Sequence, residues 1–355
     1  MHTTDAPLEP VRWREGAVRL IDQRVLPRRL EWLDCREVEA LAGAIETLAV
    51  RGAPAIGIAA AYGVALGALR AEERGEAPAR GAAEAADRLR RTRPTAVNLF
   101  HALDRMLAVL GHGGGAATGG GPVSGVPLVD ALLAEADAIL AEDLETGRRI
   151  AEHGLGVLPA GDTLTALTHC NAGGLATGGW GTALAPLVAA ARSGRRVLVY
   201  ADETRPLLQG ARLTAWELSR AGIEVRILVD GAAASVLSRE GVDLAIVGAD
   251  RIARNGDTAN KIGTLSVALG AAHAGVPFFV AAPLSTFDFG TATGSEIPVE
   301  ERSAAEVLGD HAPEGAGAVN PAFDVTPARL IRGWITEAGV LRPPFDAAVA
   351  GRKIT

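Results

Sequence analysis

The sequence has few cysteines, few lysines and no long run of basic residues. Its two cysteines, Cys35 and Cys170, stand among 355 residues, which excludes a disulfide framework and is typical of a reducing compartment. The formal net charge is -7, and without a basic tract we expect no nucleic-acid partner. Residues 1–10 also lack the charged-then-apolar order of a signal peptide. These absences predict a cytoplasmic protein.

Hydrophobic runs of the membrane-spanning type are lacking as well. The uncharged stretches 52–69 and 163–191 are long enough to raise the question, but they are rich in Ala, Gly, Thr and Pro rather than in Leu and Phe. We interpret both as buried elements of a globular protein and expect no membrane contact.

From Thr163 onward the chain alternates short apolar segments with helical ones, a pattern that the preceding residues lack. Short apolar segments predict strands at 164–169, 196–201, 224–229, 244–247 and 277–281. The segments between them predict helices at 183–192, 214–221, 232–239 and 262–274. This alternation is typical of an α/β fold with a doubly wound, mainly parallel sheet.

Residues 1–150 predict a smaller, mostly helical domain with a few short strands. The strands are expected within 10–38, and helical spacing is found at 37–48, 54–69, 84–92, 97–110 and 128–155. The glycine-rich segment 111–127 predicts a flexible surface loop. The long helix at its end is expected to join this domain to a second one, residues 151–355.

The segment Thr165–Thr182 is where we expect the chemistry. Ligands bind beyond the carboxyl ends of the strands in such sheets, and here a strand leads into Cys170 and then into a glycine-rich loop that lets backbone approach a ligand. A helix start after the loop would offer N–H groups to an anion. Further polar residues follow the other predicted strands: Asp202, Glu203, Thr204, Arg205, Asp250, Arg251, Asn260, Lys261 and Ser285.

Cys170 and Asp250 each allow two interpretations. Cys170 is either an ordinary buried cysteine or a thiolate favoured by its place between a strand and a helix N-terminus. His169 precedes it, but adjacent strand residues point to opposite faces, which argues against a Cys–His nucleophile pair. Asp250 is either a turn cap or a carboxyl group that an apolar cleft keeps protonated as a general acid.

The cationic and amide residues have the same two kinds of interpretation. Asn260 and Lys261 either cap a helix start or bind an anion there, since a lysine alone opposes the helix dipole. Arg51 and Arg93 stand at breaks between helices and are either solvated or form a phosphate clamp. Gln209 is either a polar turn residue or a ligand contact. The glycine spacing at 174–181 is too loose for a dinucleotide site, so NAD is not expected.

Seven motifs, ordered along the chain, carry a family resemblance: RGAPAIG at 51–57, THCNAG at 168–173, DETRPLLQGARLTAWEL at 202–218, GADR at 248–251, NKIGT at 260–264, IPVEER at 297–302 and NPAFDVTP at 320–327. With them the chain resembles the S-methyl-5-thioribose-1-phosphate isomerases of methionine salvage, over about residues 18–345. The wider family includes ribose-1,5-bisphosphate isomerases and regulatory subunits of the translation factor eIF2B. The segment 111–127 looks like an insertion relative to this family.

The resemblance implies an aldose-to-ketose isomerisation of a small sugar phosphate with no metal or nucleotide cofactor. It implies that Cys170 and Asp250 are the catalytic pair and that the substrate contacts are Arg51, Gly52, Ala53, Arg93, Gln209, Asn260 and Lys261. It further implies a homodimer with a smaller N-terminal domain and a Rossmann-like C-terminal domain. A ribose-1,5-bisphosphate isomerase and a non-catalytic eIF2B-like subunit are the alternatives, and both proton transfer and hydride transfer stay open as mechanisms.

Overall fold

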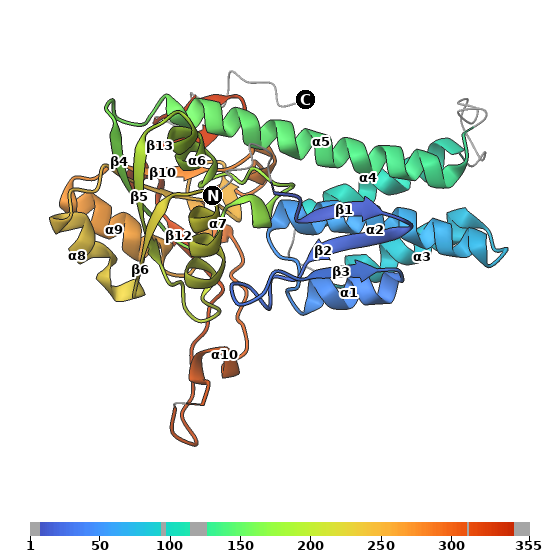
Figure 1. Ribbon diagram of the computed structural model, residues 1–355. Coiled ribbons are helices and arrows are strands. Elements are labelled where there is room, and N and C mark those ends of the chain that lie inside the picture. The colour runs from blue at the N-terminus through green and yellow to red at the C-terminus, as the bar shows by residue number, and fades with distance from the viewer. Residues whose placement is uncertain (1–7, 94–96, 114–125, 311, 344–355) are drawn as a thin grey trace. The chain divides into compact units, whose positions relative to one another are not determined.

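The structure is a computed structural model that describes residues 8–93, 97–113, 126–310 and 312–343. The chain divides into two compact units. We call Pro7–Glu145 with Gly174–Gly179 the helical unit, and Thr146–Gly173 with Trp180–Thr355 the sheet unit. Figure 1 shows their elements, and each unit is described by itself below.

The helical unit combines one small antiparallel sheet with a group of helices. Its strands pair in the order β1–β2–β3, and they are Val11–Arg14, Ala17–Ile21 and Trp32–Cys35. Its helices are α1 (Val38–Glu46), α2 (Ala53–Glu73), α3 (Pro78–Arg90), α4 (Val97–Gly113) and the first part of α5 (Leu128–Leu155). The predicted mostly helical N-terminal region with a few short strands is confirmed.

Helix α2 is the core of the helical unit. It is the one described helix that is long and apolar enough to cross a membrane, but 78% of its apolar window is buried inside the fold. Because α2 is rich in alanine and glycine, α1, α3 and α4 pack close around it. The stretch that we interpreted as a buried element is therefore a core helix.

The sheet unit contains a seven-stranded sheet with the order β14–β13–β10–β7–β4–β5–β6. All neighbours pair in parallel except β13 and β14. The strands in chain order are β4 (Thr163–Thr168), β5 (Arg196–Asp202), β6 (Glu224–Leu228), β7 (Leu244–Val247), β10 (Phe278–Ala281), β13 (Gly333–Thr336) and β14 (Gly339–Leu341). The five predicted strands are confirmed to within a residue or two at each end.

Helices cover both faces of this sheet (Figure 1). One face packs against α8 (Ala233–Arg239) and α9 (Thr264–Ala274), and the other against α6 (Ala185–Arg192), α7 (Ala215–Arg220) and the end of α5. Alternate residues of one strand take opposite sides, as Ala166 and Leu167 do. Burial on both faces explains why the central strands β7 and β10 are wholly apolar, whereas the edge strand β6 carries Glu224 and Arg226 and is largely exposed.

A second, four-stranded sheet was not predicted. Its order is β11–β8–β9–β12, formed by Phe287–Asp288, Arg251–Ala253, Thr258–Lys261 and Phe323–Thr326. These strands are short and half-polar, so their periodicity is too weak to separate them from loops. The sheet unit is completed by α10 (Ala305–Leu308).

Two predictions of local structure are wrong. Asn260 and Lys261 lie at the end of strand β9, and helix α9 begins only at Thr264. Residues 111–113, which we assigned to a loop, belong to helix α4, because its hydrogen bonding continues through two glycines. The rest of the predicted loop up to residue 125 lies outside the described residues.

Asp143, on α5 within the helical unit, is half-buried and accepts a hydrogen bond from Gly178 N at 2.5 Å. Burial is the main cause that raises the pKa of Asp143 to about 6, and the bond from Gly178 partly opposes it. The folded state therefore holds this proton more tightly than the unfolded chain, and stability falls as the pH rises from about 4 through 6.

We predict that Asp143→Asn stabilises the protein at pH 8, by about 3 kcal/mol at most. Asparagine keeps an acceptor for Gly178 N and removes the partly buried charge. Urea unfolding of parent and variant from pH 4 to 8 measures the difference, which should grow with pH. Asp130→Asn, an exposed change on the same helix, is the matched control. A difference independent of pH would contradict the assignment.

Candidate active site

The polar residues of the sheet unit gather at the carboxyl ends of three adjacent strands. Cys170 follows β4, Asp202 ends β5 and Asp250 follows β7, and these strands are neighbours in the order β7–β4–β5. The prediction that polar residues follow the carboxyl ends of the strands is thus confirmed for the central strands β7, β4 and β5.

The backbone of Cys170 is held by two threonine side chains. Cys170 N donates to Thr204 Oγ1 at 2.9 Å, and Thr214 Oγ1 donates to Cys170 O at 2.6 Å. Cys170 has φ 63, a left-handed conformation that costs a non-glycine residue about 1 kcal/mol or more. The two hydrogen bonds stabilise this turn, which directs the thiol away from the strand.

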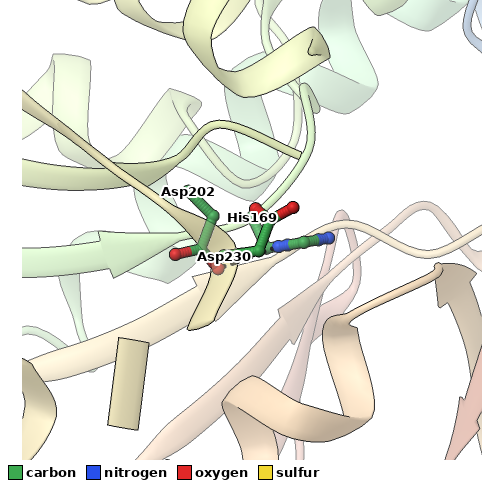
Figure 2. A group of neighbouring side chains, drawn as sticks. All are labelled: His169, Asp202 and Asp230. Carbon is green, nitrogen blue, oxygen red and sulfur yellow. Dashed lines mark hydrogen bonds and ion pairs between the residues drawn. The ribbon is translucent and has the colours of Figure 1, made fainter. Parts of the chain in front are cut away.

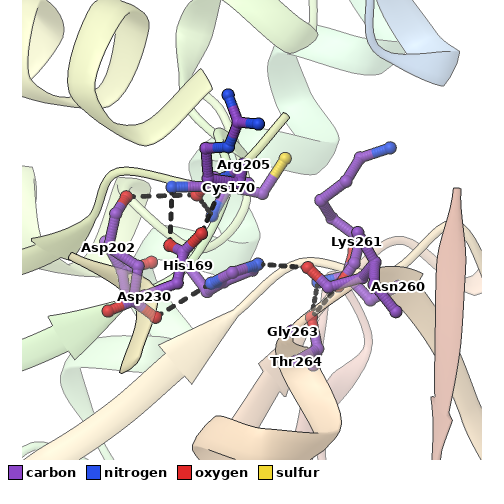
Figure 3. A network of polar contacts seen from close by, with 12 residues as sticks. His169, Cys170, Asp202, Arg205, Asp230, Asn260, Lys261, Gly263 and Thr264 are labelled. Atoms are coloured by element: carbon purple, nitrogen blue, oxygen red, sulfur yellow. Dashed lines mark hydrogen bonds and ion pairs between the residues drawn. The ribbon is translucent and has the colours of Figure 1, made fainter. Parts of the chain in front are cut away.

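Thr204 is itself fixed by Asp230. Thr204 N and Arg205 N each donate to one carboxylate oxygen of Asp230, both at 2.7 Å. Thr204 also has a left-handed backbone, with φ 64. A chain of hydrogen bonds therefore runs from Asp230 through Thr204 to Cys170 (Figure 3).

His169 is a buried link rather than a partner of the Cys170 thiol. Its Nε2 donates to Ile262 O at 2.8 Å and its Nδ1 bonds Asp202 Oδ2 at 2.9 Å. Burial disfavours the imidazolium, but the hydrogen bond with Asp202 and its charge outweigh it, so the pKa of His169 is raised. With both nitrogens engaged elsewhere, the argument against a Cys–His nucleophile pair is strengthened.

His169, Asp202 and Asp230 also form the one described cluster in which three ligand atoms lie within 4.8 Å of one another (Figure 2). Most ligand atoms in this cluster are already engaged: His169 Nδ1 bonds Asp202 Oδ2, and the two Asp230 oxygens accept from Thr204 N and Arg205 N. Among the carboxylate oxygens of this described cluster, Asp202 Oδ1 alone has no hydrogen-bond partner. A metal ion would have to displace the other bonds, so the cluster is better explained as a hydrogen-bond network.

The helix expected at 183–192 is found at Ala185–Arg192, so its predicted start is confirmed to within two residues. The glycine-rich loop forms a short 3-10 turn at Gly174–Ala176, and α6 begins only at Ala185. Gly179 and Gly181 have positive φ, so the loop bends before any long helix can start. The loop thus separates Cys170 from the N-terminus of α6 along the chain, and a thiolate at Cys170 stays a prediction.

Asp250 is anchored through its backbone, and its side chain is exposed. Asp250 N donates to Ala259 O at 2.9 Å, which ties it to strand β9 beside Asn260. Strand β7 ends three residues before Asp250, and the chain then continues into β8. The interpretation in which an apolar cleft encloses the Asp250 carboxyl group stays a prediction.

Asn260 and Lys261 are held at the end of β9. Asn260 is 5% exposed and its Nδ2 donates to Thr264 Oγ1 at 3.0 Å. Lys261 Nζ donates to Ala322 O at 3.0 Å and lies 4.8 Å from the ring centre of Phe323. In Figure 3 the side chains of Cys170, Arg205 and Lys261 extend to the same side of the view.

The N-terminus of α9 is occupied by a carboxylate from another strand. Asp324, on β12, accepts from Gly263 N at 2.8 Å and from Leu265 N at 3.0 Å. Gly263 has φ 104, and a Cβ there would lie 2.6 Å from His169 Cε1. This helix start is thus not open to a phosphate, contrary to our expectation for the residues after Lys261.

Gln209 directly precedes the short π-helical turn Gly210–Thr214. Its side chain is 7% exposed, and within the described ranges its buried Oε1 has no hydrogen-bond partner. Leaving a buried acceptor unpaired costs about 1–3 kcal/mol. A hydroxyl donor from a ligand would remove that cost.

The other predicted contacts belong to the helical unit. Arg51, Gly52 and Ala53 lie where α2 begins, and the structure gives this start no side-chain cap among the described residues. Gly52 has φ 92, which a residue with a Cβ rarely adopts. Arg93 is half-buried and follows α3. The nine predicted site residues therefore divide between two units.

The comparisons with known proteins agree on the family. Residues 49–343 match the model of the Initiation factor 2 subunit family. A methylthioribose-1-phosphate isomerase from Gemmatimonas aurantiaca is 57% identical over 95% of this chain and 94% of its own. The chain belongs to this family of isomerases. A 5-deoxyribose 1-phosphate isomerase from Moorella thermoacetica is 50% identical over 97% of both chains.

Solved structures have the same fold. A 5-methylthioribose 1-phosphate isomerase from Pyrococcus horikoshii matches with a TM-score of 0.87 and 42% identity, over 98% of this chain and 96% of that one. A chain described as the delta subunit of translation initiation factor eIF-2B from A. fulgidus matches with a TM-score of 0.85 and 43% identity, over 97% and 98%. Fold likeness alone therefore does not separate enzyme from regulatory subunit.

The positioning residues around Cys170 were missed by the sequence reasoning. Thr204 and Asp230 each follow a predicted strand, so the strand-end rule pointed to the right segments. Nothing in the spacing indicated that Thr204 accepts from Cys170 N or that Thr214 donates to its carbonyl. These contacts join segments that are more than thirty residues apart in the chain.

The two thiols should differ in reactivity. Cys35 is 4% exposed, and burial raises its pKa to about 11, which leaves roughly 0.1% thiolate at pH 8. Cys170 is partly exposed. We predict that iodoacetamide at pH 8 alkylates Cys170 at least about tenfold faster than Cys35, as measured by peptide mass mapping. Equal rates in the folded protein would contradict this.

Proposed function

We propose that the protein converts 5-methylthioribose 1-phosphate into 5-methylthioribulose 1-phosphate, an aldose-to-ketose isomerisation in methionine salvage. The observation that carries this proposal is 57% identity to a protein named for this activity, over nearly the whole of both chains. The second support is that Cys170 and Asp250 follow adjacent strands at one edge of the sheet.

The chemistry assigns different work to the two residues. A phosphate on the anomeric carbon prevents the sugar ring from opening spontaneously, so a proton must reach the ring oxygen as the C1–O bond breaks. We assign that proton to Asp250. Because its carboxyl group is exposed in the structure, bound substrate must supply the apolar cover that keeps an acid protonated near neutral pH.

Cys170 is assigned to the C2 position. In the proton-transfer path its thiolate removes the C2 proton, which gives an enediol intermediate, and the proton returns at C1. In the hydride path the hydrogen moves from C2 to C1 directly and the thiol only stabilises the transition state. The hydrogen bonds of the Cys170 backbone with the Thr204 and Thr214 side chains support either role, since they fix that backbone.

The remaining predicted residues are assigned to binding. Arg51, Arg93 and Lys261 hold the phosphate, and the N–H groups at the start of α2 beside Gly52 and Ala53 add neutral donors. Gln209 and Asn260 bond sugar hydroxyls, and the unpartnered Gln209 Oε1 suits that role.

The finer features of the protein are part of the same proposal. We assign a Rossmann-like C-terminal domain from residue 151, a smaller domain over residues 1–150, a homodimer and a cytoplasmic location. No cofactor is required, because the reaction moves a hydrogen within one molecule and leaves its redox state unchanged.

The first test is turnover of 5-methylthioribose 1-phosphate by the purified protein. Cys170→Ser and Asp250→Asn should each lower kcat by about a thousandfold or more, with circular dichroism unchanged. Cys35→Ser is the matched control, since it replaces the other thiol. Full activity in Asp250→Asn would remove that residue from the mechanism.

Isotope exchange separates the two mechanisms. In deuterium oxide, the proton-transfer path exposes the abstracted hydrogen to solvent and predicts deuterium at C1 of the product, measured by proton NMR. Complete retention of the substrate hydrogen would count strongly against that path and favour hydride transfer.

A second substrate follows from the comparisons. The Moorella thermoacetica relative is named for 5-deoxyribose 1-phosphate, which keeps the anomeric phosphate and lacks the methylthio group. If the folded parent is inert on both sugars but active on ribose 1,5-bisphosphate, the ribose-1,5-bisphosphate isomerase alternative is favoured. If it is inert on all three sugars, the non-catalytic eIF2B-like subunit is favoured.

A further inference from the structure

Gln23 lies within the helical unit, two residues after strand β2, and its side chain is 2% exposed. Its backbone N donates to Ala49 O at 2.9 Å, two residues before Arg51. A long amide side chain so deeply buried is uncommon unless both of its ends are hydrogen-bonded.

Both ends of the Gln23 amide are engaged with segments that we assign to the site. Its Nε2 donates to Leu175 O at 2.8 Å, and its Oε1 accepts from Arg51 Nε at 3.3 Å. Leu175 belongs to the loop that continues directly from Cys170. The Gln23 amide thus bridges Arg51, which we assign to the phosphate, and the loop that follows Cys170.

The same two segments also touch directly. A Cβ placed on Gly52 would lie 2.6 Å from Ala176 Cβ, so the loop packs against the backbone at the start of α2 without room for a side chain. The guanidinium is planar, and a bond at Nε sets the plane in which its other donors lie.

We propose that Gln23 is a positioning residue of the isomerase: its amide fixes the Arg51 guanidinium relative to the loop that follows Cys170. The inference rests on the proposed function, because it takes Arg51 as a phosphate ligand. Gln23 itself touches neither phosphate nor sugar. It acts through Arg51, which we assign to the phosphate, and through the loop at Leu175 that follows Cys170.

Two substitutions separate the two hydrogen bonds. Gln23→Met keeps the volume and removes both, so we expect KM to rise and kcat to fall, each about tenfold. Gln23→Glu keeps an acceptor for Arg51 Nε and loses the donor to Leu175 O. It should restore KM to near the parent value while kcat stays low.

A merely structural role predicts a different pattern. Leu26→Ala, which empties a buried position in the same turn, should lower Tm and leave KM unchanged. If Gln23→Met also lowers Tm without raising KM, the proposal is wrong.

Inhibition by inorganic phosphate gives a readout that does not depend on the sugar. As a single substitution, Gln23→Met should raise the inhibition constant for phosphate about tenfold. In a protein that already carries Arg51→Ala, Gln23→Met should leave that constant unchanged, because the effect passes through Arg51. Additive effects would overturn the proposal. A parent without turnover on any of the sugars named above would instead show that the proposed function has failed.

Discussion

The left-handed turn at Cys170 is the constraint on which the rest of the site depends. A strand of a parallel sheet ends at Thr168, and a thiol two residues later reaches a ligand only if the backbone turns sharply. That turn is unfavourable for a residue with a Cβ. Thr204 Oγ1, which accepts from Cys170 N, and Thr214 Oγ1, which donates to Cys170 O, stabilise it, and Asp230 holds Thr204 in turn. Strain at Cys170 is thus balanced by polar contacts from the next strand of the sheet.

Buried and half-buried polar side chains play the same part elsewhere in the molecule. His169 connects the end of β5 to the segment after β9 through Asp202 and Ile262 O. In the helical unit, Gln23 and Asp143 reach Leu175 O and Gly178 N, which lie in one loop. Residues 174–179 of this loop are buried, and these hydrogen bonds add to the packing that holds its backbone. The excess of glycine that set this loop apart in the sequence is therefore compatible with a defined structure.

Five strands of the large sheet could be predicted because its central part is buried on both faces, whereas β13 and β14 were not predicted. Segments such as Leu244–Val247 are apolar at every position, and the turns between them are clear. The small sheet could not be predicted in this way. Strand β9 reads TANK, and its pairing with β8 and β12 comes from backbone hydrogen bonds that leave little trace in side-chain pattern. That is why Lys261 was assigned to a helix start.

The sequence by itself determined the succession of strands and helices, the polar residues at the strand ends and, through its motifs, the family. Hydrophobic periodicity and turn chemistry are local, so a single sequence carries them. Only the tertiary structure decided which buried groups pair: Asp324 with the start of α9, Asp230 with Thr204, and Gln23 with Arg51 and Leu175. Each pairing joins segments distant along the chain, and it is set by the need of buried polar atoms for partners once the core has formed.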